Sequence, residues 1–294
     1  MPGLHPQLSG ERVIALLSAA NVIRLEEIKR YLKQVFPSLD VIAPRDLPHL
    51  AEVLQRSRDT HRVVLSVGGD GMLHQVLQGI DPATQVLGIV PAGTGNDFAR
   101  VINYPKQLRA AIEHLSNLKP QPTDYGKVNE YRFINSAGFG LDSETLRVRN
   151  HSRGILNRNY LAAYIYVLAK LRPLACRLSI DGEELDGRWY WVLAMNTPFI
   201  GGGTRVAPRA VIDDGLLDVM LIKDTPKLDL LRHLPATVKG NHLGLAIVVY
   251  RQAREIVCRT EKPLEMIAVD GEECFCAGRE VRMQVQAGQL SLLR

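Results

Sequence analysis

Two glycine-bearing segments, each lying between an apolar run and the start of a helical run, constrain this chain more than any other feature. Gly68-Gly69-Asp70-Gly71 follows the β-type run Val63–Val67, and Gly93-Thr94-Gly95-Asn96 follows Val86–Val90. Glycine lets backbone N–H groups approach an anion, and a helix start adds unpaired N–H donors and the positive end of its dipole. We therefore expect these turns to hold phosphate through Gly68, Gly69, Asp70, Gly71, Gly93, Thr94, Gly95 and Asn96.

Asp70 distinguishes the first turn from a simple anion-binding loop. A carboxylate in a phosphate-binding turn is repelled by phosphate unless a divalent cation or a proton lies between them. Handling Mg²⁺ or accepting a proton from a hydroxyl group would suit this position. The alternative is an Asx-turn, in which Asp70 bonds to its own neighbouring backbone.

The chain before these turns alternates between strand-like and helix-like patterns. Val13–Ser18 and Leu39–Ala43 have the composition of strands, whereas Arg24–Phe36 and Leu47–Arg58 have apolar residues at helical spacing, as does Lys106–Leu118. This alternation predicts a doubly wound α/β domain with a mostly parallel sheet and right-handed crossovers, over about residues 1–120.

A different pattern begins after Lys119-Pro120-Gln121-Pro122, which we interpret as a linker because neither proline suits the interior of an element. Short β-type runs then dominate, and Asp181-Gly182 is typical of a hairpin turn. They predict a mainly antiparallel β-sandwich over residues 121–279, interrupted by one helix at Asn159–Arg172. The expected strands are 124–128, 131–137, 176–180, 189–196, 217–222, 245–250, 255–259, 264–269 and 281–285.

Composition bears on the cellular compartment of the chain and on its partners. No run approaches the ~20 apolar residues of a membrane span, and Met1–His5 does not begin a signal peptide. The four cysteines lack paired metal-ligand spacing, which favours reduced thiols and a cytoplasmic protein. The formal charge of +5 is too small to indicate a nucleic-acid partner.

Two acidic turns in the second half are further candidate sites. Asp213-Asp214-Gly215-Leu216 could bind a hard cation through carboxylate and carbonyl oxygens, or could be a solvated turn. Val269-Asp270-Gly271-Glu272 exposes a carboxylate at the end of a strand, although Asp-Gly is also a frequent β-turn pair. The residues alone leave both interpretations of each turn open.

Ser66–Gly71, taken together with Pro91–Arg100, resembles the nucleotide site of the diacylglycerol kinase catalytic-domain family, which includes bacterial lipid kinases and the sphingosine and ceramide kinases. The first turn is shared with phosphofructokinases and NAD kinases, whereas the Asn-Asp-Phe-Ala-Arg tail of the second loop is typical of a narrower set of families. The resemblance implies a kinase that uses ATP and Mg²⁺ to phosphorylate a hydroxyl of diacylglycerol or a related lipid. It also implies a phosphofructokinase-like first domain that is completed by about residues 280–294.

The same resemblance assigns roles to the acidic turns. Asp270 matches the carboxylate proposed as general base, with Glu272 as its neighbour, and Asp70 belongs to the same catalytic set. Asp214 and the carbonyl of Leu216 match a structural Mg²⁺ site, although Val211 lacks the ligating side chain of relatives.

Several departures from the family pattern keep two alternatives open. Met72 and Gln75 replace the usual Thr and Glu after the first turn, and Leu17–Asn21 lacks the usual Pro and Gly. A catalytically weak nucleotide- or lipid-binding regulator is one alternative, and an NAD kinase-like phosphotransferase is the other.

The expected partner is the lipid substrate, with a homodimer kept as an assembly to test. The cationic run over Arg147–Arg158 suits transient contact with an anionic membrane surface, or else is a solvated face.

Overall fold

The computed structural model describes residues 10–294, so Met1–His5 lies outside the described residues. Backbone contacts divide the chain into two units. Unit 1 contains the described residues up to Asp124 together with Gly288–Arg294, and unit 2 contains Tyr125–Ala287. The boundaries expected from the sequence were near residues 120 and 280.

Unit 1 is built on a parallel sheet with strand order β4-β3-β1-β2. Residues of β1, β3 and β4 are buried throughout, as expected for strands covered on both faces. Alternate residues such as Val13, Leu65 and Val90 share one core with helices α1 and α5, while α2 packs against α3. The bounds are β1 Val13–Leu17, β2 Leu39–Ile42, β3 Val63–Gly68, β4 Val86–Pro91, the 3-10 helix η2 Ala19–Arg24, α1 Leu25–Val35, α2 Leu47–Ser57, α3 Asp70–Gly79, α4 Asp97–Val101 and α5 Leu108–Leu115.

The end of the chain adds a further strand to this sheet. The long strand β15 (Glu272–Leu293) leaves unit 2 and pairs in parallel with β4, with Ser291 opposite Val86. The hydroxyl of Tyr104 donates a hydrogen bond to the carbonyl of Leu293 at 3.4 Å. Leu293 itself is fully buried in the core of unit 1.

Unit 2 is mainly antiparallel. Strand β14 pairs with both β7 and β8, and each of these pairs with β9, so the four strands close on one another. Strands β12 and β13 extend the sheet from β9. The bounds are β5 Pro120–Val128, β6 Tyr131–Phe133, β7 Ser136–Gly140, β8 Leu174–Ile180, β9 Glu183–Met195, β10 Phe199–Ile200, β11 Thr204–Arg205, β12 Leu217–Lys223, β13 Val248–Ala253 and β14 Glu255–Val269.

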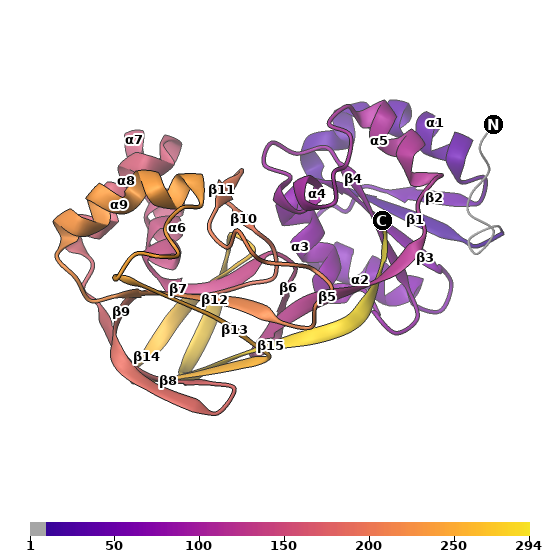
Figure 1. Ribbon diagram of the computed structural model, residues 1–294. Helices are drawn as coiled ribbons and strands as arrows, with labels where there is room; N and C mark the ends of the chain where they lie inside the picture. Colours follow the sequence, from indigo (N-terminus) through magenta and orange to yellow (C-terminus); the bar gives the residue numbers. More distant parts are fainter. Residues whose placement is uncertain (1–9) are drawn as a thin grey trace. The chain divides into compact units, whose positions relative to one another are not determined.

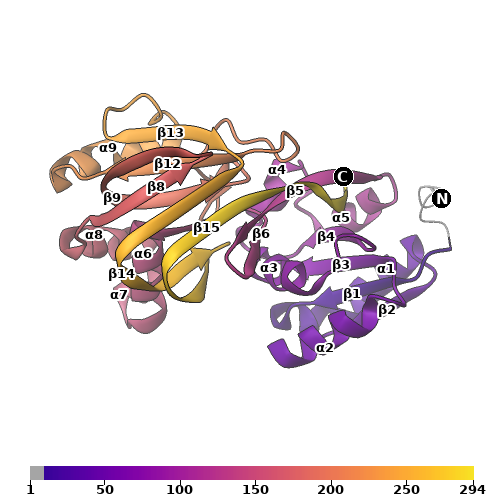
Figure 2. The same cartoon turned by 90° about the horizontal axis from the view of Figure 1, so that it is seen from below.

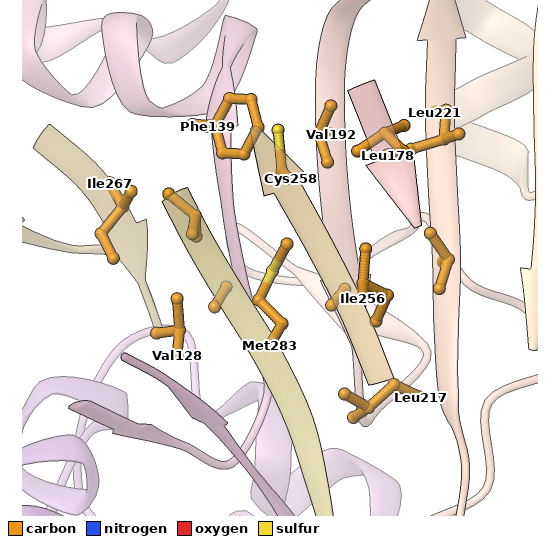
Figure 3. Packing of buried hydrophobic residues seen from close by; sticks show 14 of the residues in the cluster. Val128, Phe139, Leu178, Val192, Leu217, Leu221, Ile256, Cys258, Ile267 and Met283 are labelled. Carbon is orange, nitrogen blue, oxygen red and sulfur yellow. The ribbon is translucent and has the colours of Figure 1, made fainter. Parts of the chain in front are cut away.

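Two cores lie on opposite sides of strand β9, because side chains alternate along a strand. Val192 contributes to the core between the strands, which Figure 3 shows together with Phe139, Cys258 and Met283. Trp191 and Leu193 contribute to the other core, beneath the helices. These helices gather on one face of the unit 2 strands (Figures 1 and 2); they are α6 Leu141–His151, α7 Ile155–Arg158, α8 Tyr160–Lys170 and α9 Lys227–Lys239.

The predicted linker at Lys119–Pro122 is wrong, because this segment begins strand β5. Lys119 and Arg294 exchange backbone hydrogen bonds of 3.4 and 3.1 Å, and the Arg294 guanidinium donates to the carbonyl of Pro122 at 3.0 Å. Proline is tolerated in a strand where its missing N–H is not needed. The returning end of the chain thus pairs with residues that local composition marks as irregular.

Other boundaries in unit 2 also differ from the prediction. The run 131–137 is divided into β6 and β7, while 255–259 and 264–269 form the single irregular strand β14, with its register shift between Arg259 and Leu264. Helices α6, α7 and α9 were not expected, and α9 contains Pro235. Among residues 10–294, no helix is long and apolar enough to span a bilayer. The expected fold class, a doubly wound α/β part followed by a β-rich part, is confirmed.

Candidate functional site

The two glycine turns lie against each other at the carboxyl edge of the unit 1 sheet. Strands β3 and β4 pair in parallel with Gly68 opposite Pro91, and the amide of Ala92 donates to the carbonyl of Gly68 at 2.8 Å. A Cβ added to Gly93 would lie 2.3 Å from the Cα of Gly69, a distance that no side chain tolerates. Glycine is therefore needed where the backbones of the two turns touch.

The second turn is closed by the side chain of Asn96. Its Oδ1 accepts a hydrogen bond from the amide of Gly93 at 3.2 Å, and its Nδ2 donates to the carbonyl of Gly93 at 2.8 Å. Asn96 has a left-handed backbone with φ 51°, a conformation that asparagine adopts more readily than most residues. The side chain of Asn96 thus fixes the shape of the loop immediately before α4.

Asp70 is the first residue of α3 and connects the two turns. Its Oδ1 accepts a hydrogen bond from the amide of Phe98, in the first turn of α4, at 3.4 Å. The partner is 28 residues away in the sequence. The described residues thus place Asp70 between the two helix starts, rather than in the Asx-turn that we considered as an alternative.

A third segment, Ser18–Asn21, borders the same edge and was not predicted as part of the site. The amide of Ser18 donates to the carbonyl of Val67 at 3.0 Å. The Nδ2 of buried Asn21 donates to the Ser18 hydroxyl at 2.8 Å and to the carbonyl of Ala92 at 3.3 Å. The position of this segment after β1, which is the neighbour of β3 in a parallel sheet, was the signal that could have identified it.

A cavity of about 480 Å³ opens beside the second turn. It is lined by the turn itself and by Arg100, Tyr104 and Lys106. The guanidinium of Arg100 donates to the carbonyl of Gly95 at 3.3 Å, which holds this cation beside the loop. The volume lies in the range of small-molecule sites, and the two basic side chains suit an anionic ligand.

In unit 2, Asp270 occupies a hairpin turn and also anchors a neighbouring segment. Asp270 and Gly271 both have positive φ, 52° and 82°, as a type I′ turn between β14 and β15 requires. The Asp270 carboxylate accepts three backbone hydrogen bonds: one from Ile134 at 2.9 Å, one from Asn135 at 2.7 Å and one from Ser136 at 3.0 Å. The sequence predicted the turn, but not this anchoring of the link between β6 and β7.

The anchored link belongs to a larger polar network. The Asn196 side chain donates to the carbonyl of Ile134 at 2.9 Å, and the Thr197 hydroxyl donates to the Asn135 side chain at 3.0 Å. Both Asn196 and Thr197 are fully buried. Glu272, two residues after Asp270, is exposed. The hairpin thus combines one carboxylate held by amides with another at the surface.

The candidate metal turn contains only part of the donor set of relatives. The Asp214 carboxylate accepts a hydrogen bond from the amide of Leu216 at 3.0 Å, which is the geometry of an Asx-turn. Val211 is exposed and has no ligating side chain. Within residues 10–294 no group of three or more His, Cys, Asp or Glu side chains is placed to hold a metal. Asp214 and the Leu216 carbonyl are oxygen donors of the kind that Mg²⁺ takes, and water would have to complete the site.

Asp142, at the start of α6, is buried and gives the chain a testable pH dependence. Burial raises its pKa to about 7, well above that of an exposed aspartate. The unfolded chain therefore releases this proton near pH 4 and the folded chain near pH 7, so stability falls as the pH rises between these values. We expect Asp142→Asn to remove about 3 kcal/mol of that fall, measured by urea unfolding at pH 5 and pH 8, because pH 5 already lies about one unit above the pKa of an exposed aspartate. An equal dependence of the unfolding free energy on pH in both proteins would contradict the raised pKa of Asp142. Part of the fall should persist in the variant, because burial also raises the pKa of Asp218 to about 7.

Comparison with known proteins identifies the family. Residues 18–128 match the diacylglycerol kinase catalytic domain, and residues 135–294 match the YegS C-terminal NAD kinase beta sandwich-like domain. The diacylglycerol kinase of Bacillus subtilis is 30% identical over 217 residues, which is 71% of each chain. This chain belongs to the diacylglycerol kinase catalytic-domain family.

The fold agrees with that of solved family members. A crystal structure of a diacylglycerol kinase from Bacillus anthracis superposes with a TM-score of 0.74 at 20% identity, covering 96% of both chains. Yeast NADH kinase has a TM-score of 0.50 at 11% identity, covering 96% of this chain and 82% of that one. The NAD kinase fold is thus a distant relative, and the glycine turns lie within the part that matches the diacylglycerol kinase catalytic domain.

Proposed function

We propose that this chain transfers the γ-phosphate of ATP to a hydroxyl of diacylglycerol or a closely related lipid. The observation that carries the proposal is the contact between the two glycine turns, which places two sets of backbone amides and the basic cavity side by side. Unit 1 would bind ATP through Gly68, Gly69, Asp70, Gly71, Gly93, Thr94, Gly95 and Asn96, and unit 2 would bind the lipid. The enzyme would work in the cytoplasm, with transient contact at the membrane surface.

The chemistry requires positioning and charge neutralisation more than covalent help. The lipid hydroxyl oxygen attacks the γ-phosphorus, the bond from that phosphorus to the β–γ bridging oxygen breaks, and ADP leaves. Mg²⁺ would neutralise the phosphate oxygens, with Asp70 as its candidate partner. Asp270 and Glu272 are the candidates for accepting the hydroxyl proton, and Asp214 with Leu216 for a structural Mg²⁺.

A phosphate-transfer assay with labelled ATP tests this proposal directly. Diacylglycerol, a sphingosine-like lipid and NAD are offered in parallel under the same conditions. We expect transfer to diacylglycerol or a related lipid, with Mg²⁺ required and chelation abolishing turnover. Transfer to NAD alone would replace the proposal with an NAD kinase. Tight ATP binding without transfer to any lipid would indicate a regulator.

A further inference from the structure

Helices α7 and α8 of unit 2 expose a set of apolar side chains that the fold does not cover. Leu161 and Ile165 lie one turn apart on the outer side of α8 and are 52% and 45% exposed, whereas Ala163 and Val167 on the inner side are buried. Ile155 of α7 is 68% exposed. Exposed apolar residues are ordinary when scattered, but a cluster on adjoining helices marks an interaction surface.

The charged residues of the segment that forms this cluster have a single sign. Between Glu144 and Asp181 the sequence contains six arginines and one lysine and no acidic residue. Arg153, Arg158 and Arg172 are exposed, and the ion pairs of the described residues include none of the three. A surface that is apolar at its centre and cationic at its border complements anionic lipid headgroups over hydrocarbon.

A basic hollow adjoins the exposed cluster. A cavity of about 680 Å³ lies between α6 and α8 and is lined by Arg147, His151, Lys170 and Arg172, with Glu144 paired to Arg147. The Lys170 ammonium lies 4.2 Å from the centre of the Tyr166 ring, and Tyr166 is itself exposed. Tyrosine and lysine side chains with an apolar body and a polar end are typical of the boundary between water and lipid.

We propose that Ile155, Leu161 and Ile165, bordered by Arg153, Arg158 and Arg172, form the surface with which this protein docks on an anionic lipid bilayer. The proposal rests on the proposed function, because a lipid kinase with no spanning helix among its described residues must reach a substrate held in a membrane. The apolar side chains enter the headgroup layer, and the arginines contact lipid phosphates. A second copy of the chain is the competing occupant, but the exposed arginines at the border, Arg153, Arg158 and Arg172, oppose self-association.

Vesicle sedimentation tests the surface. Wild-type protein is expected to bind phosphatidylglycerol–phosphatidylcholine vesicles and to bind pure phosphatidylcholine vesicles at least tenfold more weakly. Arg153→Gln/Arg158→Gln should weaken binding to the anionic vesicles by roughly 25-fold, about fivefold per charge at low ionic strength. Leu161→Ser/Ile165→Ser should weaken binding to the same vesicles at least tenfold. The four substituted side chains are all exposed, so both variants should fold.

The control variant is Leu47→Ser/Arg45→Gln, which changes an exposed apolar residue and an exposed arginine in unit 1. It should bind vesicles like wild type. The docking proposal is overturned if wild type ignores anionic vesicles, or if the Arg153/Arg158 and Leu161/Ile165 variants bind like wild type. It is also overturned if Leu161→Ser/Ile165→Ser dissociates a dimer in solution and leaves vesicle binding unchanged.

Turnover on two forms of diacylglycerol separates this proposal from the proposed function. With a short-chain diacylglycerol dispersed in water, the surface variants should match wild type. With diacylglycerol embedded in anionic vesicles, their turnover should fall at least tenfold. Absence of wild-type turnover on both forms would reject the kinase activity, while vesicle sedimentation would still decide the docking surface.

Discussion

Asp70→Asn is expected to lower turnover by roughly 10²-fold or more, the range associated with loss of a group that handles a proton or a catalytic metal. The fold should persist, because the asparagine Oδ1 can still accept the hydrogen bond from the Phe98 amide. Steady-state kinetics at saturating ATP and a thermal melt measure the two effects separately. Asp46→Asn is the matched control. The Asp46 carboxylate also accepts a hydrogen bond from a backbone amide at a helix start, that of His49 at 2.8 Å, but this helix is α2.

The control variant should retain wild-type turnover and differ only slightly in melting temperature. If Asp70→Asn also retains wild-type turnover, Asp70 has no part in the reaction. If it unfolds instead, the carboxylate acts mainly by joining the two turns.

Asp270→Asn is expected to lose both activity and stability. An asparagine has one acceptor oxygen, and its NH₂ group would face one of the amides of Ile134, Asn135 or Ser136. Leaving such a group unsatisfied costs about 1–3 kcal/mol, so the free energy of unfolding should fall by this amount. Turnover of the folded fraction should fall at least tenfold if Asp270 also accepts the lipid proton.

The chain provides a matched control for this variant in Asp181, which occupies the other Asp-Gly hairpin. Its φ is 48°, and its carboxylate accepts hydrogen bonds from the backbone amides of Arg254 and Glu255. Asp181→Asn should lower stability similarly and leave turnover of the folded protein unchanged. If Asp270→Asn shows the same pattern, Asp270 is a positioning residue and the base lies elsewhere, with Glu272 as the next candidate.

The parts of the fold that were predicted correctly are those in which local pattern and tertiary structure agree. Strands β1 to β4 are apolar runs with helical runs between them, so their parallel pairing follows from the alternation. The glycine turns follow directly from two of these strands. Their contact, which requires glycine at residue 93, depends on β3 and β4 being neighbours.

The errors arise where distant residues override local composition. Pro120 and Pro122 mark an irregular segment, yet the end of the chain pairs with it and makes it a strand. The anchoring role of Asp270 could not be predicted for the same reason, because its three donors lie 134 to 136 residues away in sequence. Helix α6 was missed because its many charged residues obscure the few apolar ones that face the core.

The central claim is that the triphosphate of ATP rests against the backbone amides of residues 68–71 and 93–96. Titrating ¹⁵N-labelled protein with ATP and Mg²⁺ while recording amide chemical shifts tests it most directly. The largest shifts should fall on Gly68–Gly71 and Gly93–Asn96, with smaller ones at Arg100 and Lys106. Saturating ATP that leaves both turns unshifted while perturbing amides elsewhere would contradict the claim.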